Sequence, residues 1–343
     1  MKKILLLISI CGLWTTNYNA QEIKNAATFT GQQVTGVTVS DQGRIFANFP
    51  RWRQNVQYSV VEVLENGSSK AFPNKEWNSW NLGKTLSHDT FVAVQSVVAF
   101  ENILYVLDTR NPLFSGVMGN PVIFAFDLES NELIRSYILS EQSFCGNSYI
   151  NDLRIDKKNG EMYLTDLVRA GLVVIDLESG ESFRVLDNHE STLAETDQLT
   201  FSNGVWKNTV HSDGIALDTK NDKLYYHALT GYNLYAVPTN VLTSGNEKEI
   251  QNHVILVAKT PAPDGMIIDD SGNLFLADLE NQKIKKYTIP KKKLSVFAEG
   301  ENIKWADTFS IHNNELYCTN SRINEASGDI SDMDFSINKI KID

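Results

Sequence analysis

Residues 212–239 read SDGIALDTKNDKLYYHALTGYNLYAVPT and set the pattern for the whole chain. An Asp-Gly pair opens a short apolar segment, and a polar turn leads to a second apolar segment that contains an aromatic residue. Another turn leads to a third segment. Short apolar runs separated by Asp, Asn and Gly are typical of consecutive antiparallel strands. The stretch therefore predicts a small antiparallel sheet.

Similar phrases recur along the chain, such as PDGMIIDDSGNLFLAD at residues 263–278 and NDLRIDKKNGEMYLTD at residues 151–166. An aromatic residue in the second segment marks each copy, and it recurs at Phe46, Tyr105, Tyr163, Tyr225, Phe275 and Tyr317. Repeats of roughly 40–50 residues with four strands each are typical of β-propellers. Six copies predict an all-β, six-bladed β-propeller. A β-sandwich gives no reason for turn and aromatic residue to recur together.

Closure of the ring is predicted from the strands that remain unassigned. The sixth copy supplies three strands, the last at residues 334–342, and the strand-length segment 23–29 has no other place. An open sheet edge would leave backbone N–H and C=O groups unpaired. We therefore expect residues 23–29 to pair with residues 334–342, and residues 21–343 to form one propeller domain.

Residues 1–20 have the composition of a secretory signal peptide: Lys2 and Lys3, an apolar run at 4–13, and Ala20 before the expected cut. The apolar run is too short to span a bilayer. The sequence thus predicts export to the periplasm or the extracellular space. Export permits a disulfide between Cys145 and Cys318, but burial as separate thiols is the alternative, and the sequence leaves the pairing open.

The net charge of −11 and the 42% hydrophobic content indicate an acidic globular protein. Nucleic acids and anionic membranes need a basic surface, so we expect neither as a partner, and no integral membrane association. A small molecule is the expected partner, and the oligomeric state is left open.

The candidate ligand-binding residues come from the repeat register. The inner strands of a propeller converge on a central channel, and their first residues line its mouth. These residues are Gln95, Asp152, Asp213, Asp264 and Asp307. Carboxylates around a narrow channel repel one another unless a metal, an ammonium group or protons lie among them. The alternative for each Asp is a hydrogen bond to backbone amides of the neighbouring blade.

Aromatic and histidine side chains in the loops complete the candidates. Trp52 and Phe114, and with them Trp77, Trp80 and Trp206, could cap a pocket and contact a cation, or simply pack between blades. His88 and His211 each precede an inner strand, where a histidine could act as a base near neutral pH. The catalytic candidates are His211, Asp213 and Asp264.

Several phrases of the chain resemble the yellow/major royal jelly protein family: FPRW at residues 49–52, YINDLRID at 149–156, and DFSINKIKI at 334–342, besides residues 170–186 and 212–239. The resemblance implies a six-bladed propeller, and with its bacterial-style signal the chain looks like a bacterial member. Roles in that family are divided between dopachrome conversion, binding of biogenic amines, and storage or structure. Membership alone therefore does not define the function.

A weaker resemblance is to SMP-30/gluconolactonase propellers, which hold a divalent metal in the channel with a Glu, two Asn and an Asp. PDGMIID places Asp264 at the Asp, INDLRID places Asn151 at one Asn, and Asp213 stands where the other Asn would be. The Glu has no counterpart. The resemblance implies one divalent cation, Ca²⁺ first, held by these three residues. Because the Glu is missing, the alternative is that the metal site is lost and that the chain has no cofactor.

Three hypotheses follow. The first is an exported propeller that binds a small amine or aromatic ligand at the channel mouth. The second is a metal-dependent lactonase-like hydrolase, or a dopachrome-type isomerase (a tautomerase), that uses the same channel. The third is a secreted scaffold without a small ligand, whose interface would be the inserted loops 109–119 and 187–209.

Overall fold

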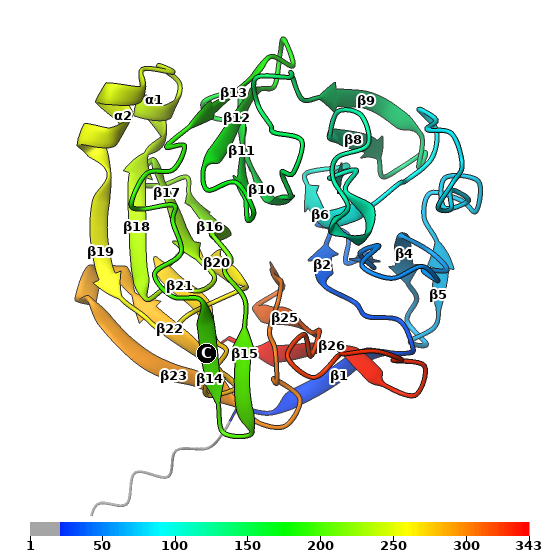
Figure 1. The fold of residues 1–343 in the computed structure, drawn as a ribbon. Coiled ribbons are helices and arrows are strands. Elements are labelled where there is room, and N and C mark those ends of the chain that lie inside the picture. Colours follow the sequence, from blue (N-terminus) through cyan, green and yellow to red (C-terminus); the bar gives the residue numbers. More distant parts are fainter. Residues whose placement is uncertain (1–20, 343) are drawn as a thin grey trace, which may run out of the picture.

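The computed structural model describes residues 21–342, which form six four-stranded antiparallel sheets arranged as blades around a central axis (Figure 1). The first strand of each blade lies nearest the axis. This confirms the six-bladed propeller that the aromatic repeat predicts. The signal-peptide prediction falls on residues 1–20, which lie outside the described residues.

The first three blades follow the chain in simple order. Blade one consists of β2 (Gly36–Val39), β3 (Ile45–Asn48), β4 (Val60–Val63) and β5 (Ser69–Ala71). Blade two consists of β6 (Val94–Phe100), β7 (Ile103–Asp108), β8 (Val122–Asp127) and β9 (Leu133–Ile138). Blade three consists of β10 (Ile150–Asp156), β11 (Glu161–Asp166), β12 (Leu172–Asp176) and β13 (Ser182–Val185).

The last three blades include the closing one. Blade four consists of β16 (Ser212–Asp218), β17 (Lys223–Ala228), β18 (Asn233–Pro238) and β19 (Ile255–Lys259). Blade five consists of β20 (Met266–Ile268), β21 (Asn273–Asp278), β22 (Lys283–Thr288) and β23 (Lys293–Glu299). Blade six consists of β24 (Phe309–His312), β25 (Glu315–Asn320), β26 (Asp334–Lys341) and β1 (Ile23–Thr30).

The remaining elements are insertions between these strands. They are the helices α1 (Thr239–Leu242) and α2 (Glu247–His253), the short 3-10 turns η1 (Pro112–Phe114) and η2 (Ile289–Lys291), and the hairpin β14 (Gln198–Phe201) and β15 (Gly204–Lys207). The hairpin lies within the insert 187–209, for which the sequence predicts only a polar loop.

The predicted closure is confirmed. β1 pairs antiparallel with β26, from Ile23 opposite Ile340 to Thr30 opposite Asp334. A β-bulge between Asn25 and Ala27 shifts the register, and it explains why the apolar alternation of this strand is imperfect in sequence. The inner strands contact one another in a closed circle: β2, β6, β10, β16, β20, β24 and again β2.

The six repeat aromatics belong to the core, and each is at most 6% exposed. They lie between adjacent blades. Phe46 of blade one, for example, belongs to the same buried cluster as Leu104 of blade two. The loop tryptophans Trp77 and Trp80 also pack in the interior, Trp77 against the rings of blade two and Trp80 under the guanidinium of Arg51. Neither is a site residue.

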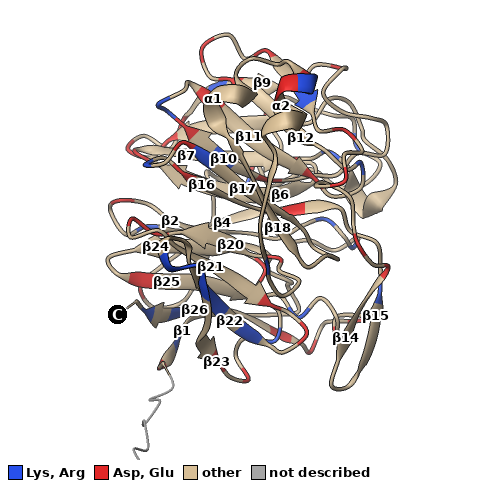
Figure 2. Ribbon diagram, turned by 90° about the vertical axis from the view of Figure 1, so that its left-hand side faces the viewer, with Lys and Arg blue, Asp and Glu red and all other residues tan. Residues whose placement is uncertain are grey.

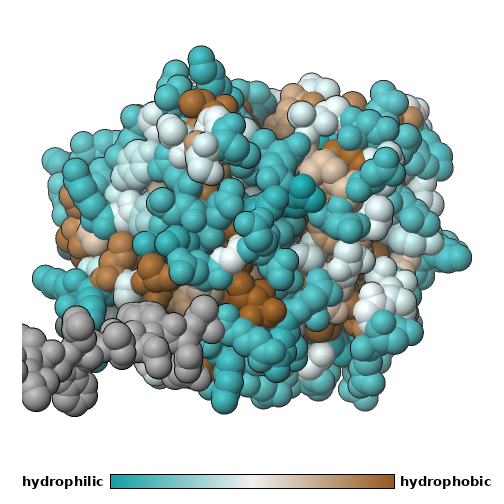
Figure 3. Space-filling model, turned by 90° about the horizontal axis from the view of Figure 1, so that it is seen from below, coloured by the Kyte–Doolittle hydropathy of each residue, from teal (hydrophilic) through white to brown (hydrophobic). Residues whose placement is uncertain are grey.

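The surface is mixed in charge and polarity. Acidic and basic residues are interspersed in Figure 2, where β22 is a prominent basic strand. The face seen in Figure 3 is mainly hydrophilic, with hydrophobic side chains in small separate patches. Among residues 21–342, no helix has the length and apolar character needed to cross a bilayer. Cys145 and Cys318 do not pair, and burial raises the pKa of the Cys318 thiol to about 12.

Candidate functional site

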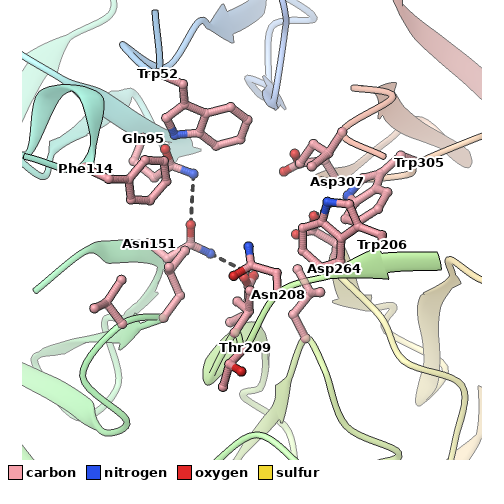
Figure 4. Close-up of a pocket in the computed structure, with 16 residues that line it drawn as sticks. Trp52, Gln95, Phe114, Asn151, Trp206, Asn208, Thr209, Asp264, Trp305 and Asp307 are labelled. Atoms are coloured by element: carbon pink, nitrogen blue, oxygen red, sulfur yellow. Dashed lines mark hydrogen bonds between the residues drawn. The ribbon is translucent and has the colours of Figure 1, made fainter. Parts of the chain in front are cut away.

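A cavity of about 370 Å³ lies at one mouth of the central channel (Figure 4). Its volume is in the range of small-molecule sites. In Figure 4, Trp52 and Phe114 stand on one side, Trp206 and Trp305 on the other, and Asn151 and Asn208 between them. The polar lining includes the predicted ligand-binding residues Gln95, Asp213, Asp264 and Asp307. None of the described lining residues is Lys or Arg.

Strand irregularities direct three of these side chains into the channel. The pairing of the inner strand with its neighbour shifts between Val94 and Ser96 in blade two, between Ile150 and Leu153 in blade three, and between Ser212 and Ile215 in blade four. Each shift falls where a channel residue sits. A bulge re-aims a side chain that a regular strand would direct elsewhere.

The Asp-Gly pairs of the repeat have a packing reason. A Cβ atom on Gly214 would lie 2.8 Å from the backbone oxygen of Asp264, and one on Gly265 would lie 2.7 Å from that of Asp307. Only glycine permits so close an approach. The glycines therefore let the channel aspartates of blades four, five and six pack next to one another.

A chain of hydrogen bonds crosses the floor of the cavity. The Trp52 indole donates to Tyr149 Oη (2.6 Å), and the Tyr149 hydroxyl donates to Gln95 Oε1 (2.9 Å). Gln95 Nε2 donates to Asn151 Oδ1 (2.9 Å), and Asn151 Nδ2 donates to Asp213 Oδ1 (2.8 Å). All of these donors point in one direction, toward the aspartates.

The chain ends at a pair of carboxyl groups. Asp213 and Asp264 share a side-chain hydrogen bond, and the Trp305 indole donates to Asp264 Oδ2 from the opposite side (2.6 Å). The hydrogen bond between the two carboxyl groups lowers the pKa of Asp264 and raises the pKa of Asp213. The oxygens of Asp213 otherwise meet only the Asn151 amide, and no backbone N–H donates to Asp213 or Asp264 among the described residues.

Burial raises the pKa of all three channel carboxyl groups. The pKa of Asp213 lies well above its ordinary value because the group is desolvated and faces Asp264 and Asp307. Desolvation raises the pKa of Asp264 to about 7, against the lowering effect of the hydrogen bonds from Trp305 and Asp213. Desolvation and Asp264 likewise raise the pKa of Asp307 well above its ordinary value. The cavity floor therefore binds protons readily at neutral pH.

Asp152 does not line this cavity, contrary to the simple register. It borders a smaller polar void on the channel, together with Ser96 and Thr308. Its Oδ2 pairs with Arg154 Nη1 at 2.9 Å, and Arg154 Nη2 reaches the backbone oxygen of Met266 in blade five (2.9 Å). Because blade three has a bulge here, Asn151 and not Asp152 faces the cavity. Asp152 is neutralised within the protein.

Two aromatic groups form the walls. Phe114 stacks on Tyr149 with ring centroids 4.4 Å apart and on Trp52 at 6.1 Å. On the other side Trp305 is contacted by Trp206 (5.1 Å), which the β14–β15 hairpin carries, and by Phe201 (5.9 Å). The hairpin thus supplies one wall of the cavity.

The histidine candidates lie outside the cavity. His211 is half-buried, its Nδ1 accepts the backbone N–H of Ala194 (3.0 Å), and burial lowers its pKa. His88 is exposed in a loop. The structure therefore brings Asp213 and Asp264 together but not His211 with them.

The predicted metal ligands do not fit a divalent cation as they lie. Asn151 Oδ1 is turned to Gln95 Nε2, its Nδ2 faces Asp213, and Asp213 and Asp264 hydrogen-bond to each other. Ca²⁺ needs six to eight oxygen ligands. Within residues 21–342, no group of three or more His, Cys, Asp or Glu side chains is placed to hold a metal ion.

Sequence reasoning misses Tyr149, Trp305 and Asn208. Tyr149 lies two residues before Asn151, and Trp305 lies two residues before Asp307. An aromatic residue two positions before a channel residue is the signal that could have found both. Asn208 lies in the long insert, and no pattern marks it.

Solved propellers of low sequence identity share the fold. A luciferin-regenerating enzyme superposes with a TM-score of 0.60 at 13% identity, covering 94% of this chain and 95% of that one. Virginiamycin B lyase from Staphylococcus aureus gives 0.53 at 12% identity (94% and 100%). The PQQ-bound aldose sugar dehydrogenase from Streptomyces coelicolor gives 0.55 at 11% identity (93% and 98%). At these identities the likeness concerns the fold alone.

Sequence comparisons identify the family. Major royal jelly protein 3 from Apis mellifera is 21% identical over 271 residues, which is 73% of this chain and 48% of that protein. The chain thus spans about half the length of this curated relative. The family model described as "Major royal jelly protein" matches residues 93–343, which include the channel residues from Gln95 to Asp307. The chain belongs to the major royal jelly protein family.

Proposed function

We propose that this protein binds a small organic cation that carries an aromatic ring, an aromatic amine, in the cavity at the channel mouth. The observation that carries the proposal is the floor of three carboxyl groups, the buried Asp213 and Asp264 and the half-buried Asp307, to which no Lys or Arg among the described lining residues supplies a positive charge. Arg154, on the inner strand of blade three, is paired with Asp152 instead.

An ammonium group would stabilise the ionised form of the carboxyl groups in this floor. Carboxyl groups that are desolvated and close together favour the neutral, protonated form. A ligand cation at hydrogen-bond distance would replace the protons and let Asp264 and its neighbours ionise. The same cation would be poorly bound if a Lys or Arg lined the cavity, and none of the described lining residues is one.

The walls would hold the ring of such a ligand. Trp52 and Phe114 on one side and Trp206 on the other offer flat apolar surfaces above the carboxyl groups (Figure 4). Aromatic faces also attract a cation, by about 0.5–2 kcal/mol each. Small-molecule sites of this kind combine apolar walls with a few polar groups that fix orientation.

Isothermal titration calorimetry with 2-phenylethylamine and 2-phenylethanol at pH 8 tests the proposal. The two compounds differ in the group that would meet the carboxylates. We expect saturable one-to-one binding of the amine and at least about tenfold weaker binding of the alcohol, as for loss of a hydrogen bond to a charged group. Equal binding of the two, or no binding of this amine or of tryptamine, would overturn it.

Matched variants assign the binding to the cavity. Asp264→Asn should weaken the amine and leave the alcohol unchanged. Trp206→Ala should weaken both by about 0.5–1.5 kcal/mol, because it removes a ring against which the ring of either compound can pack. Asp187→Ala, at an exposed position outside the cavity, is the control and should change neither.

A second candidate function is proton transfer on a bound ligand, as in a tautomerase. The observation that favours it is the hydrogen-bonded Asp213–Asp264 pair, in which the pKa of Asp213 is raised well above its ordinary value and that of Asp264 is raised to about 7. A general acid–base works best when its pKa is close to the ambient pH. Solvent-deuterium exchange into a bound enolisable amine, followed by NMR, would detect it. Exchange at the same rate in Asp264→Asn would exclude the pair.

A further inference from the structure

A second cavity, of about 350 Å³, lies where blade one meets the loop before β26. Its walls come from residues 31–33, 49–50, 53–56 and 328–331, so it combines the entry to blade one with the closing blade. It contains amide side chains, a guanidinium and one carboxylate, and the ring of Phe49, only 3% exposed, offers little surface. Its chemistry is therefore unlike that of the channel cavity.

Arg53 is the distinctive group of this cavity. Its Nη1 donates to Gln33 Oε1 (2.5 Å) and its Nη2 donates to the backbone oxygen of Ala326 (2.6 Å). Gln33 is itself 6% exposed, and its Nε2 is held by the backbone oxygen of Ser321 (2.8 Å). The guanidinium is thus fixed in orientation by a buried side chain.

Among residues 21–342, Arg53 has no acidic partner. Other half-buried arginines form ion pairs, for example Arg44 with Glu62 (2.8 Å) and Arg322 with Glu325 (2.6 Å), but Arg53 makes none within residues 21–342. Burial lowers its pKa, and no neighbouring charge offsets the effect. A guanidinium has five N–H donors, and two of them are used here. The free donors suit a planar, two-oxygen anion.

Asp329 lies in the wall of the same cavity and restricts the anion. Its Oδ1 accepts the backbone N–H of Ser331 (3.0 Å), and hydrogen bonds from Ser331 lower its pKa, so the group is ionised at neutral pH. A dianion such as phosphate would be repelled by it. A carboxylate with hydroxyl or ammonium groups could place the carboxylate on Arg53 and donate hydrogen bonds to Asp329, and the amides of Gln32 and Gln54 offer further partners.

We propose that this cavity is a second binding site, for a small carboxylate that also carries hydroxyl or ammonium groups, with the carboxylate held by Arg53. Sugar acids and amino acids share this chemistry. The site is independent of the channel cavity, although the adjacent residue, Trp52, lines that cavity.

NMR titration of the ¹⁵N-labelled protein tests the assignment in the wild-type chain. Gluconate and serine are the two probes, and sorbitol, which has a hydroxymethyl group in place of the carboxylate of gluconate, is the control. We expect at least one probe to shift the Arg53 Nε–H resonance saturably, and sorbitol to leave it unchanged. No shift with either probe, tighter binding of inorganic phosphate, or equal binding of sorbitol would overturn the proposal.

The affinities of substituted proteins for gluconate and serine provide a second, independent test. Arg53→Gln should weaken the bound carboxylate by at least about tenfold, as expected for hydrogen bonds to a charged group. Asp329→Asn should weaken serine more than gluconate if the ammonium group meets Asp329, which separates the two ligand sources. Asp264→Asn, in the channel, should leave both affinities unchanged. Undiminished binding in Arg53→Gln would show that the carboxylate lies elsewhere.

Discussion

The aspartates that end the second strands of blades two and three are as deeply buried as the channel aspartates, but their surroundings differ. Asp108 accepts backbone N–H groups of Val92, Ala93 and Arg110 at 2.6–3.0 Å. Asp166 accepts three backbone N–H groups and the guanidinium of Arg184 (2.9 Å).

The channel aspartates Asp213 and Asp264 accept no such backbone hydrogen bonds from the described residues. Among the described residues, Asp213 and Asp264 meet side-chain donors only, and they hydrogen-bond to each other. A buried carboxylate that accepts a full set of hydrogen bonds connects strands and loops and stabilises the fold. A buried carboxylate that lacks them destabilises the ligand-free protein, and binding of a cation would relieve that cost. Burial of an acid is therefore no sign of function unless the donors around it are counted.

Asp166→Ala should have the largest effect, because it removes an acceptor from a complete network. Arg184, whose side chain is 8% exposed, would lose its buried partner. We expect a loss of about 3–5 kcal/mol in the free energy of unfolding, measured by urea denaturation. Asp187→Ala removes the more exposed partner of Arg184 and should cost less than about 1 kcal/mol. If Asp166→Ala, like Asp187→Ala, lowers the free energy of unfolding by less than about 1 kcal/mol, the hydrogen bonds of Asp166 do not stabilise the fold. The contrast between the strand-end aspartates and the channel aspartates would then be wrong.

Asp264→Asn should change stability in the opposite direction. The pKa of Asp264 is raised from 3.8 to about 7, so the folded protein binds more protons than the unfolded chain between these values. The wild-type contribution to stability therefore falls as pH rises through that window. We expect Asp264→Asn to be more stable than the wild type by about 1–3 kcal/mol at pH 8, and the gain to vanish near pH 4.

The test uses the difference in unfolding free energy between Asp264→Asn and the wild type at each pH, because other groups also change the stability of both proteins with pH. Burial lowers the pKa of His227 to about 4, so its contribution to stability is lost as pH falls from about 6.5 toward 4. This effect has the opposite sign in the same range and cancels in the difference. A variant that is less stable than the wild type at pH 8 would show that the channel carboxylate is well satisfied.

The affinity for an aromatic amine should depend on pH for the same reason. Binding an ammonium group requires ionised Asp264, so affinity should rise from pH 5.5 to about 7, by up to about tenfold per pH unit, and then level off. Calorimetry in two buffers of different ionisation enthalpy should show proton release below pH 7. Asp264→Asn should bind weakly with a flatter pH profile, and an unchanged slope would assign the proton elsewhere.

Calcium should have the smallest effect. The oxygens of Asn151, Asp213 and Asp264 are committed to one another and to Gln95, so we expect no change of melting temperature with millimolar CaCl₂ or EDTA. A ligand that binds the folded state must raise its stability. A clear rise with CaCl₂ that Asp264→Asn abolishes would mean that the channel rearranges around the ion.

The sequence predicts the fold further than it predicts the site. The repeat of turn and aromatic residue is a local pattern, and it defines six blades. β1 follows by elimination, because residues 23–29 are the one strand-length segment left for the incomplete sixth blade. The channel residues Gln95, Asp213, Asp264 and Asp307 also follow from the register.

What the sequence does not show depends on contacts between distant residues. The bulge in β10 turns Asn151, and not Asp152, toward the cavity. A bulge is an extra residue relative to the partner strand, so the sequence of β10 alone does not reveal it. Trp305 meets Asp264 across 41 residues, and Trp206 reaches Trp305 on a hairpin that reads as a polar loop. Pairings of this kind are set by packing between blades and leave no periodic trace.

The pairing of β1 with β26 has a consequence for the order of events during synthesis. Of the described strands, β1 leaves the ribosome first and its partner β26 leaves last, and the contact of Asn25 with Asn338 spans 313 residues. Blades two to five can form as they emerge, because their strands are neighbours in the chain. The ring cannot close until β26 has emerged, so a nascent chain that lacks β26 keeps β1 unpaired. Such a chain gains the stability of the closed ring only once β26 is available.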